Sequence, residues 1–202
     1  RSISWEEAIT MITTKLVDLR SAGRPERLVL LDGQEWGVRG QILERFAKLG
    51  HTRTFRLDPV SDLDIQTPGG GVESVQDRML PDVARRIVGA HRRFDVVVAR
   101  HILEHVHSPK TFVAAIRELL APGGMLVLEV PDCAKPLQQR DYTMLWEEHS
   151  LYFTQATFHN AILALGFTIV GERVYPYTTE SSLTIVAVDA GDTAILPDAE
   201  AL

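Results

Sequence analysis

The chain has 202 residues, long enough for one domain with a substantial core and short for two. Its 45% hydrophobic and 24% charged residues exclude an intrinsically disordered chain, and charges interrupt every apolar run before it reaches the length of a membrane span. A formal net charge of -6 argues against a general nucleic-acid binder, which would present a basic field. The single cysteine, Cys133, allows neither an internal disulfide nor a cysteine-based zinc cluster, and it favours the cytoplasm.

The first part of the chain alternates predicted helices with predicted strands. Ser4 and Glu7 have the spacing of a capping box, which predicts a helix that continues to about Arg20. The apolar run 27–33 predicts a buried strand, and apolar residues at helical spacing predict a helix over 37–50. Further along, the pattern predicts a strand at 53–59, a weak strand at 72–75 and a helix at 81–90.

The second part continues this alternation but ends differently. The run FDVVVA (94–99) has the composition of a strand that is buried on both faces. Ser108 followed by Pro109 predicts the start of a helix that reaches about Leu120. After this helix, we expect a turn at 122–124, a strand at 125–130, a polar loop, a helix near 155–165 and two strands at 167–175 and 182–189. Because no helix separates the last two strands, they should pair antiparallel.

This order of elements predicts the fold class. Alternating strands and helices indicate an α/β fold, here a doubly wound, Rossmann-like, mostly parallel sheet that ends in a C-terminal antiparallel hairpin. We expect a single domain over residues 1–190, including the N-terminal helix, and a loosely ordered acidic tail over 191–202.

Ligands of such sheets bind beyond the carboxyl ends of the strands. Three strand ends are informative here: the segment LDGQEWGVRG (31–40), Asp58 and Arg100-His101. Glycines allow close approach of the backbone to a ligand, and Asp58, 18 positions after Gly40, could accept the two hydroxyls of a ribose. Each feature also has a purely structural interpretation, as a turn, a strand end or a helix cap. Together they predict a nucleoside-containing cofactor.

The segment HILEH (101–105) matches the H-x-x-E-H pattern of a class of zinc peptidases. That chemistry needs His101 and His105 on one face of a long helix, with Glu172 or Glu180 as a nominal third ligand. The strand before the segment and the helix start after it leave room for about one turn. We therefore predict a loop here and no metal site.

The segment FDVVVARHILEHVHSPKTFVAAIRELLAPGGMLVLEVPD (94–132) resembles the core of class I S-adenosylmethionine-dependent methyltransferases. The resemblance extends over nearly the whole chain, includes the closing hairpin and is most specific from about Phe94 to Phe167. Within this family, EVPD followed by WEEHSLYFT resembles the group related to the sugar C-methyltransferases, whose loop carries Tyr-x-Glu-His. Trp146 takes the place of that tyrosine.

The resemblance implies which residues bind the cofactor and which act on the acceptor. S-adenosylmethionine would be bound by residues at the strand ends, namely Asp32, Gly33, Gly37, Gly40, Asp58, Asp77, Arg100 and His101. His149 would be the general base, because methyl transfer to carbon or hydroxyl oxygen requires that the acceptor lose a proton. Glu148 would orient its ring, and Tyr152 would hydrogen-bond the acceptor. The structural alternative is that His149 and Tyr152 anchor the loop on the sheet.

The resemblance thus implies a cytoplasmic methyltransferase that acts on a small molecule, such as a sugar nucleotide or glycoside-like metabolite, by C- or O-methylation. We expect neither nucleic acid nor a membrane as partner. The first loop departs from the usual Gly-x-Gly-x-Gly, with Trp36 and Val38 where small residues are common. That departure, and a first residue other than Met, favour an alternative: a non-catalytic binding or scaffold domain of a larger protein. The missing G-x-G-x-x-G disfavours a nicotinamide-dependent oxidoreductase.

Overall fold

The computed structural model describes residues 10, 12, 14–15, 17, 28–32, 47–48, 50–51, 53–58, 62–64, 78–145, 149–176 and 181–191, with the backbone alone over 28–32. The described residues between 10 and 17 are helical, as predicted, and Ile12 is buried. Residues 47 and 48 are also helical, near the end of the predicted second helix. The predicted weak strand at 72–75 and the tail from 192 lie outside the described residues.

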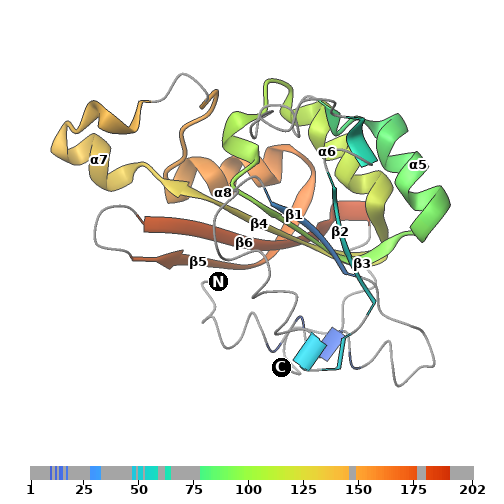
Figure 1. Ribbon diagram of the computed structural model, residues 1–202. Helices are drawn as coiled ribbons and strands as arrows, with labels where there is room; N and C mark the ends of the chain where they lie inside the picture. Colours follow the sequence, from blue (N-terminus) through green and yellow to red (C-terminus); the bar gives the residue numbers. More distant parts are fainter. Residues whose placement is uncertain are drawn as a thin grey trace.

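A six-stranded mixed sheet forms the centre of the described structure (Figure 1). Its strands are β1 (Leu28–Asp32), β2 (Thr54–Arg56), β3 (Phe94–Arg100), β4 (Leu120–Asp132), β5 (Phe167–Tyr175) and β6 (Ser181–Asp189). They lie in the order β2-β1-β3-β4-β6-β5. The first four in this order run parallel, whereas β6 is antiparallel to both β4 and β5. The predicted parallel sheet with an antiparallel closing hairpin is therefore confirmed.

Strand β3 is apolar apart from Asp95 and Arg100, and its central place in the sheet explains this composition. Phe94 through Ala99 are buried, and only Arg100 at the carboxyl end is partly exposed. A parallel strand in the middle of a sheet is covered on both faces, so both faces are mainly apolar. Arg100 marks the point where the strand leaves the core.

Three helices, α5 (Pro81–His91), α6 (Pro109–Leu119) and α8 (Gln155–Ala164), lie together on one side of the sheet in Figure 1. Helix α6 buries Phe112, Ile116 and Leu119, whose spacing places them on one helical face. Phe158 and Ile162 of α8 are buried in the same core. None of the helical segments among the described residues is both long and apolar enough to cross a membrane.

Strand β4 differs from its prediction because it begins at Leu120 and includes the segment expected to turn. Gly123 has a φ of 67°, and a Cβ on Gly124 would lie 2.8 Å from the carbonyl oxygen of Ala121 and 3.2 Å from that of Phe94. Gly123 thus supplies a backbone conformation that side chains rarely adopt. Gly124 leaves room for the carbonyl oxygens of Ala121 in β4 itself and of Phe94 in β3, where the register shifts between Phe94 and Val96. The predicted turn at 122–124 is wrong in this respect.

The segment after β4, predicted as a polar loop, contains helix α7 (Ala134–Gln139) and the 3-10 helix η2 (Tyr142–Met144). A second difference concerns the start of α6. The hydroxyl of Ser108 hydrogen-bonds Thr111 Oγ1 at 2.8 Å and does not cap the backbone. Pro109 occupies the first turn as predicted.

Candidate functional site

The carboxyl ends of the central strands meet at one edge of the sheet. By register, Asp32 pairs with Arg100, and Arg100 pairs with Glu129. Leu30 of β1 pairs with Arg56 of β2. Asp32 and Asp58 each follow two residues later in the chain. Asp58 is exposed, and its backbone N–H donates a hydrogen bond of 2.7 Å to Asp62 Oδ2. The edge predicted to bind a ligand therefore has Asp32 and Arg100 at the ends of β1 and β3, and Asp58 two residues after the end of β2.

The structure does not describe all of the predicted site residues. The backbone of Asp32 is placed, but its side chain is not among the described atoms. Gly33, Gly37, Gly40, Asp77 and Glu148 lie outside the described residues.

Arg100 is held by an ion pair across the sheet. Its Nε lies 2.5 Å from Glu129 Oε2, and Nη2 donates to Oε1 at 3.2 Å. Ser182 on β6 donates a further hydrogen bond of 2.9 Å to Glu129 Oε1. Burial alone would raise the pKa of Glu129, but hydrogen bonds from His101 and Arg100 and their positive charges hold it well below its ordinary value. Glu129 is thus a charged acceptor that fixes Arg100, and no sequence signal pointed to Ser182.

His101 follows directly and has a backbone φ of 50°, which is unusual for a residue with a side chain. Its Nδ1 lies 3.3 Å from Glu104 Oε1, and its Nε2 lies 3.6 Å from Glu129 Oε1. Burial by itself lowers the pKa of His101, but the two carboxylates outweigh it and raise the pKa to about 9. His101 is therefore an imidazolium at neutral pH, set between two acidic residues.

The segment after His101 is a short 3-10 helix, η1 (Leu103–His105), whose three residues are all buried. The prediction that HILEH forms a loop of about one turn, not a long helix, is confirmed. Of the third ligands considered for a zinc peptidase, Glu172 hydrogen-bonds His159 at 2.8 Å and Glu180 lies outside the described residues.

His149 and Tyr152 come from the loop that precedes α8. The ring of His149 lies edge-on to that of His105, with centroids 4.6 Å apart, and 5.9 Å from the ring of Tyr152. Burial lowers the pKa of His149 below its ordinary value; His105 and His101 add to this effect, and Glu104 opposes it. The ring is therefore neutral at neutral pH and can accept a proton.

This loop is also tied firmly to the sheet. The N–H of Leu151 donates to the carbonyl of Glu104 at 2.9 Å, and the N–H of Cys133 donates to the carbonyl of Phe153 at 2.7 Å. Phe153 is buried against Phe158, with ring centroids 5.3 Å apart. The anchoring part of the loop is thus Leu151 and Phe153, which places His149 and Tyr152 beside η1.

Three side chains that could bind a metal ion lie close together where η1 meets this loop. Glu104, His105 and His149 each offer an oxygen or nitrogen atom, and these atoms all lie within 4.8 Å of one another. Glu104 and His105 are buried and His149 is half-buried. Sequence reasoning considered His101 with His105 and missed this grouping, because His149 is distant in the chain.

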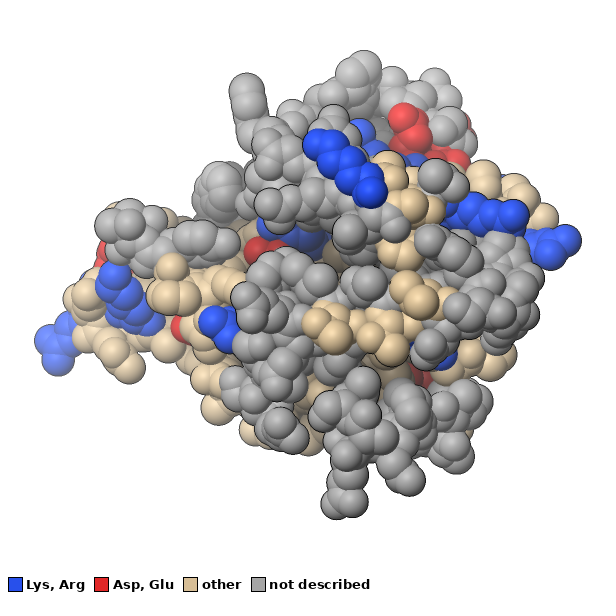
Figure 2. Space-filling model, turned by 90° about the horizontal axis from the view of Figure 1, so that it is seen from below, with Lys and Arg blue, Asp and Glu red and all other residues tan. Residues whose placement is uncertain are grey.

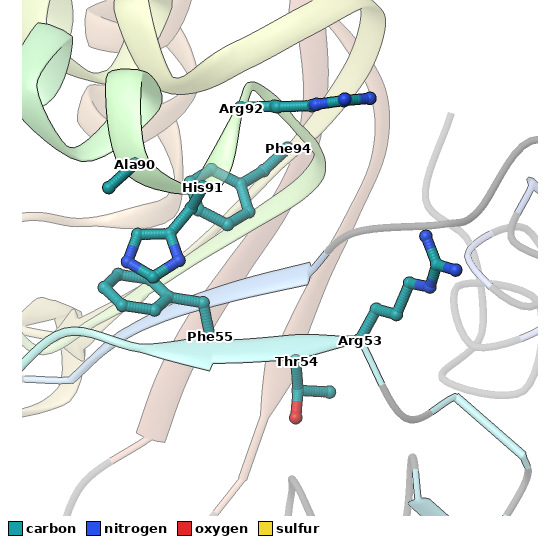
Figure 3. Close-up of a pocket in the computed structure, with 7 residues that line it drawn as sticks. All are labelled: Arg53, Thr54, Phe55, Ala90, His91, Arg92 and Phe94. Atoms are coloured by element: carbon teal, nitrogen blue, oxygen red, sulfur yellow. The ribbon is translucent and has the colours of Figure 1, made fainter.

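A separate hollow of about 460 Å³ lies at the opposite end of the sheet, at the amino ends of β2 and β3. Figure 3 shows the ring of His91 against that of Phe55 there, with Arg53 and Arg92 on the rim; the two rings are 4.2 Å apart. Ligands of parallel α/β sheets bind at the carboxyl edge, so we do not assign the cofactor to this hollow.

A model of the methyltransferase domain matches residues 16–172. The chain belongs to this family. The domain is 27% identical over 187 residues to the C-methyltransferase NovU of Streptomyces niveus, which covers 91% of this chain and 43% of NovU. A ubiquinone biosynthesis O-methyltransferase of Cereibacter sphaeroides is 46% identical over 44 residues, 22% of this chain and 18% of that protein. The chain thus spans less than half the length of both relatives.

Solved structures of methyltransferases have a fold similar to that of this domain. A SAM-dependent methyltransferase from Archaeoglobus fulgidus has a TM-score of 0.51 at 14% identity, covering 88% of this chain and 93% of that one. The glycopeptide N-methyltransferase MtfA, complexed with sinefungin, has a TM-score of 0.50 at 14% identity, with 87% and 92% covered. The predicted class I S-adenosylmethionine-dependent methyltransferase fold is confirmed, and NovU supports its relation to the C-methyltransferases.

Proposed function

We propose that this domain transfers the sulfonium methyl group of S-adenosylmethionine to a small-molecule acceptor. Family membership supports the reaction. The observation that carries it to this chain is the carboxyl edge, where Asp32 and Arg100 end β1 and β3 and Asp58 follows the end of β2 by two residues. This is the edge at which α/β sheets bind nucleoside ligands. The structural relative MtfA was solved with sinefungin, a ligand of that protein.

Each part of the cofactor would contact different residues at this edge. Asp58 would accept the ribose hydroxyls, and the segment from Asp32 through Gly40 would surround the methionine and ribose parts. Asp77 would face the adenine. Arg100 and His101 would line the pocket beside the sulfonium, where the charges of Glu129 and Glu104 offset their own.

His149 is our proposed general base. Its half-buried ring lies on a loop anchored beside the end of β4, next to His105 and Tyr152. From this position it could take the acceptor proton as the methyl group is transferred. Tyr152 would bind the acceptor, and Glu148 would orient the ring of His149.

The acceptor we propose is a sugar nucleotide or a related glycoside-like metabolite. The similarity to a C-methyltransferase over 91% of this chain supports C-methylation, and the short match to a ubiquinone biosynthesis O-methyltransferase keeps O-methylation open. On the face seen in Figure 2, the described Lys and Arg side chains are scattered among other residues. That distribution gives no support to a nucleic-acid substrate. We place this activity in the cytoplasm and within one domain over residues 1–190.

The second candidate is a non-catalytic domain of the same fold, favoured by Trp36 and Val38 in the first loop. Calorimetric titration with S-adenosylhomocysteine, with NADH as a control, separates the two. Micromolar binding of S-adenosylhomocysteine alone supports the enzyme. A folded protein that binds neither compound would overturn it, and the scaffold function would then lead.

A further inference from the structure

A buried carboxylate without a hydrogen bond lies at the centre of η1. The side chain of Glu104 is 2% exposed, and among the residues that the structure describes neither of its oxygens has a hydrogen-bond partner. His101 Nδ1 lies 3.3 Å from Oε1 and forms an ion pair with it. Burying a carboxylate costs free energy unless a cation and hydrogen-bond donors complete its surroundings, and the ion pair with His101 leaves both oxygens able to accept further bonds.

The imidazoles of His105 and His149 provide the rest of a coordination set. Candidate ligand atoms of Glu104, His105 and His149 lie within 4.8 Å of one another. Two histidines and one glutamate form a known donor set for zinc, with nitrogen and oxygen ligands at about 2.0–2.2 Å and a further position for water or substrate. Binding at such distances would draw the three atoms inward. Imidazole ligands favour zinc and its neighbours over magnesium.

We propose that Glu104, His105 and His149 form a binding site for a divalent transition-metal ion of the zinc type. The site is held by two connected segments. Glu104 and His105 are adjacent on η1, and the loop that carries His149 is attached to η1 through the hydrogen bond from Leu151 N–H to the Glu104 carbonyl, at 2.9 Å. The third ligand is therefore positioned by the backbone that carries the first.

This site goes beyond methyl transfer and does not depend on it. A histidine nitrogen that coordinates a metal ion cannot also accept a proton, because the other nitrogen of the ring then carries its hydrogen. The metal-bound state and the state in which His149 acts as general base therefore exclude each other. A bound ion would withdraw His149 from the reaction.

The test is a titration of the chelator-treated full chain with Zn²⁺ by calorimetry and with Co²⁺ by visible absorption. We expect one equivalent bound, with the intense d–d bands of a four-coordinate Co²⁺ site. Glu104→Gln, which keeps the side-chain volume, should weaken binding at least about tenfold. His159→Gln is the matched control, because that histidine pairs with Glu172 outside the cluster. Equal binding by both variants, or no binding by the wild type, would overturn the proposal.

A measurement on the wild-type chain avoids reliance on variants that fold poorly. Histidine side-chain NMR signals of His105 and His149 should shift on addition of Zn²⁺, whereas that of His159 should not. Shifts confined to other histidines would contradict the site. Because both experiments detect metal directly, their failure is distinguishable from failure of S-adenosylhomocysteine to bind.

Discussion

The imidazole of His149 meets the ring of His105 edge to face, with the two ring planes at 83°. One histidine comes from the short helix after the central strand, and the other from the loop before α8. This contact places the half-buried, neutral ring of His149 next to the sheet edge where the carboxyl ends of the parallel strands meet.

Replacing His149 by alanine should reduce turnover about 10²–10⁴-fold, because an acceptor that keeps its proton is a poor nucleophile. Affinity for S-adenosylhomocysteine should stay unchanged, since the ring is assigned to the acceptor. Single-turnover kinetics and calorimetry measure the two effects. His91→Ala, at the opposite end of the sheet, serves as a control and should leave both unchanged. Full turnover in the His149 variant would remove this residue from the mechanism.

Asp58→Asn should weaken the binding of S-adenosylhomocysteine about tenfold or more, because a hydrogen bond to a charged group contributes about 1.5–3 kcal/mol. Asp58 is exposed, so the free energy of unfolding should change little. A suitable control is Glu118→Gln, which removes a carboxylate from an ion pair with Arg85 and Arg93. If both variants bind the cofactor product as the wild type does, Asp58 does not contact the ribose.

Glu129→Gln should destabilise the fold by about 1–3 kcal/mol at pH 7, since Arg100 loses a charged acceptor. The pKa of Glu129 is lowered in the folded chain, so its contribution is present above the unfolded value of about 4.5 and is lost as the pH falls further. Urea unfolding at pH 7 and at about pH 3 should therefore show the difference between variant and wild type shrinking in acid. A difference that is constant with pH would mean that packing, not charge, is responsible.

Two glycine replacements should change stability in opposite directions. Gly89 is exposed in α5, and a Cβ there would meet no atom within 4 Å, so Gly89→Ala should stabilise the helix by about 0.5–1 kcal/mol. In Gly124→Ala the new Cβ would lie 2.8 Å from a backbone oxygen, which should cost about 1–3 kcal/mol. Thermal unfolding compares the three proteins. A Gly124→Ala chain as stable as the wild type would show that the carbonyl oxygens around Gly124 can move aside without cost.

Much of the fold could be predicted because its signals are local. The apolar run of β3, the Ser108-Pro109 helix start and the absence of a helix between β5 and β6 each depend on neighbouring residues, and each led to the correct element. The same local pattern correctly limited HILEH to one turn. Local patterns failed at the glycines of β4, which were predicted to turn, because the segment from Leu120 is instead part of a strand that pairs with β3.

The pattern of residues along the chain was enough to predict the class of fold and the residues available at the strand ends. Only the tertiary structure decided which of them meet: Ser182 reaches Glu129 because β6 pairs with β4, and His149 reaches Glu104 and His105 because its loop bonds to η1. These contacts join segments that are distant in the chain. Their geometry depends on strand register and on loop anchoring, which no periodicity in a single sequence encodes.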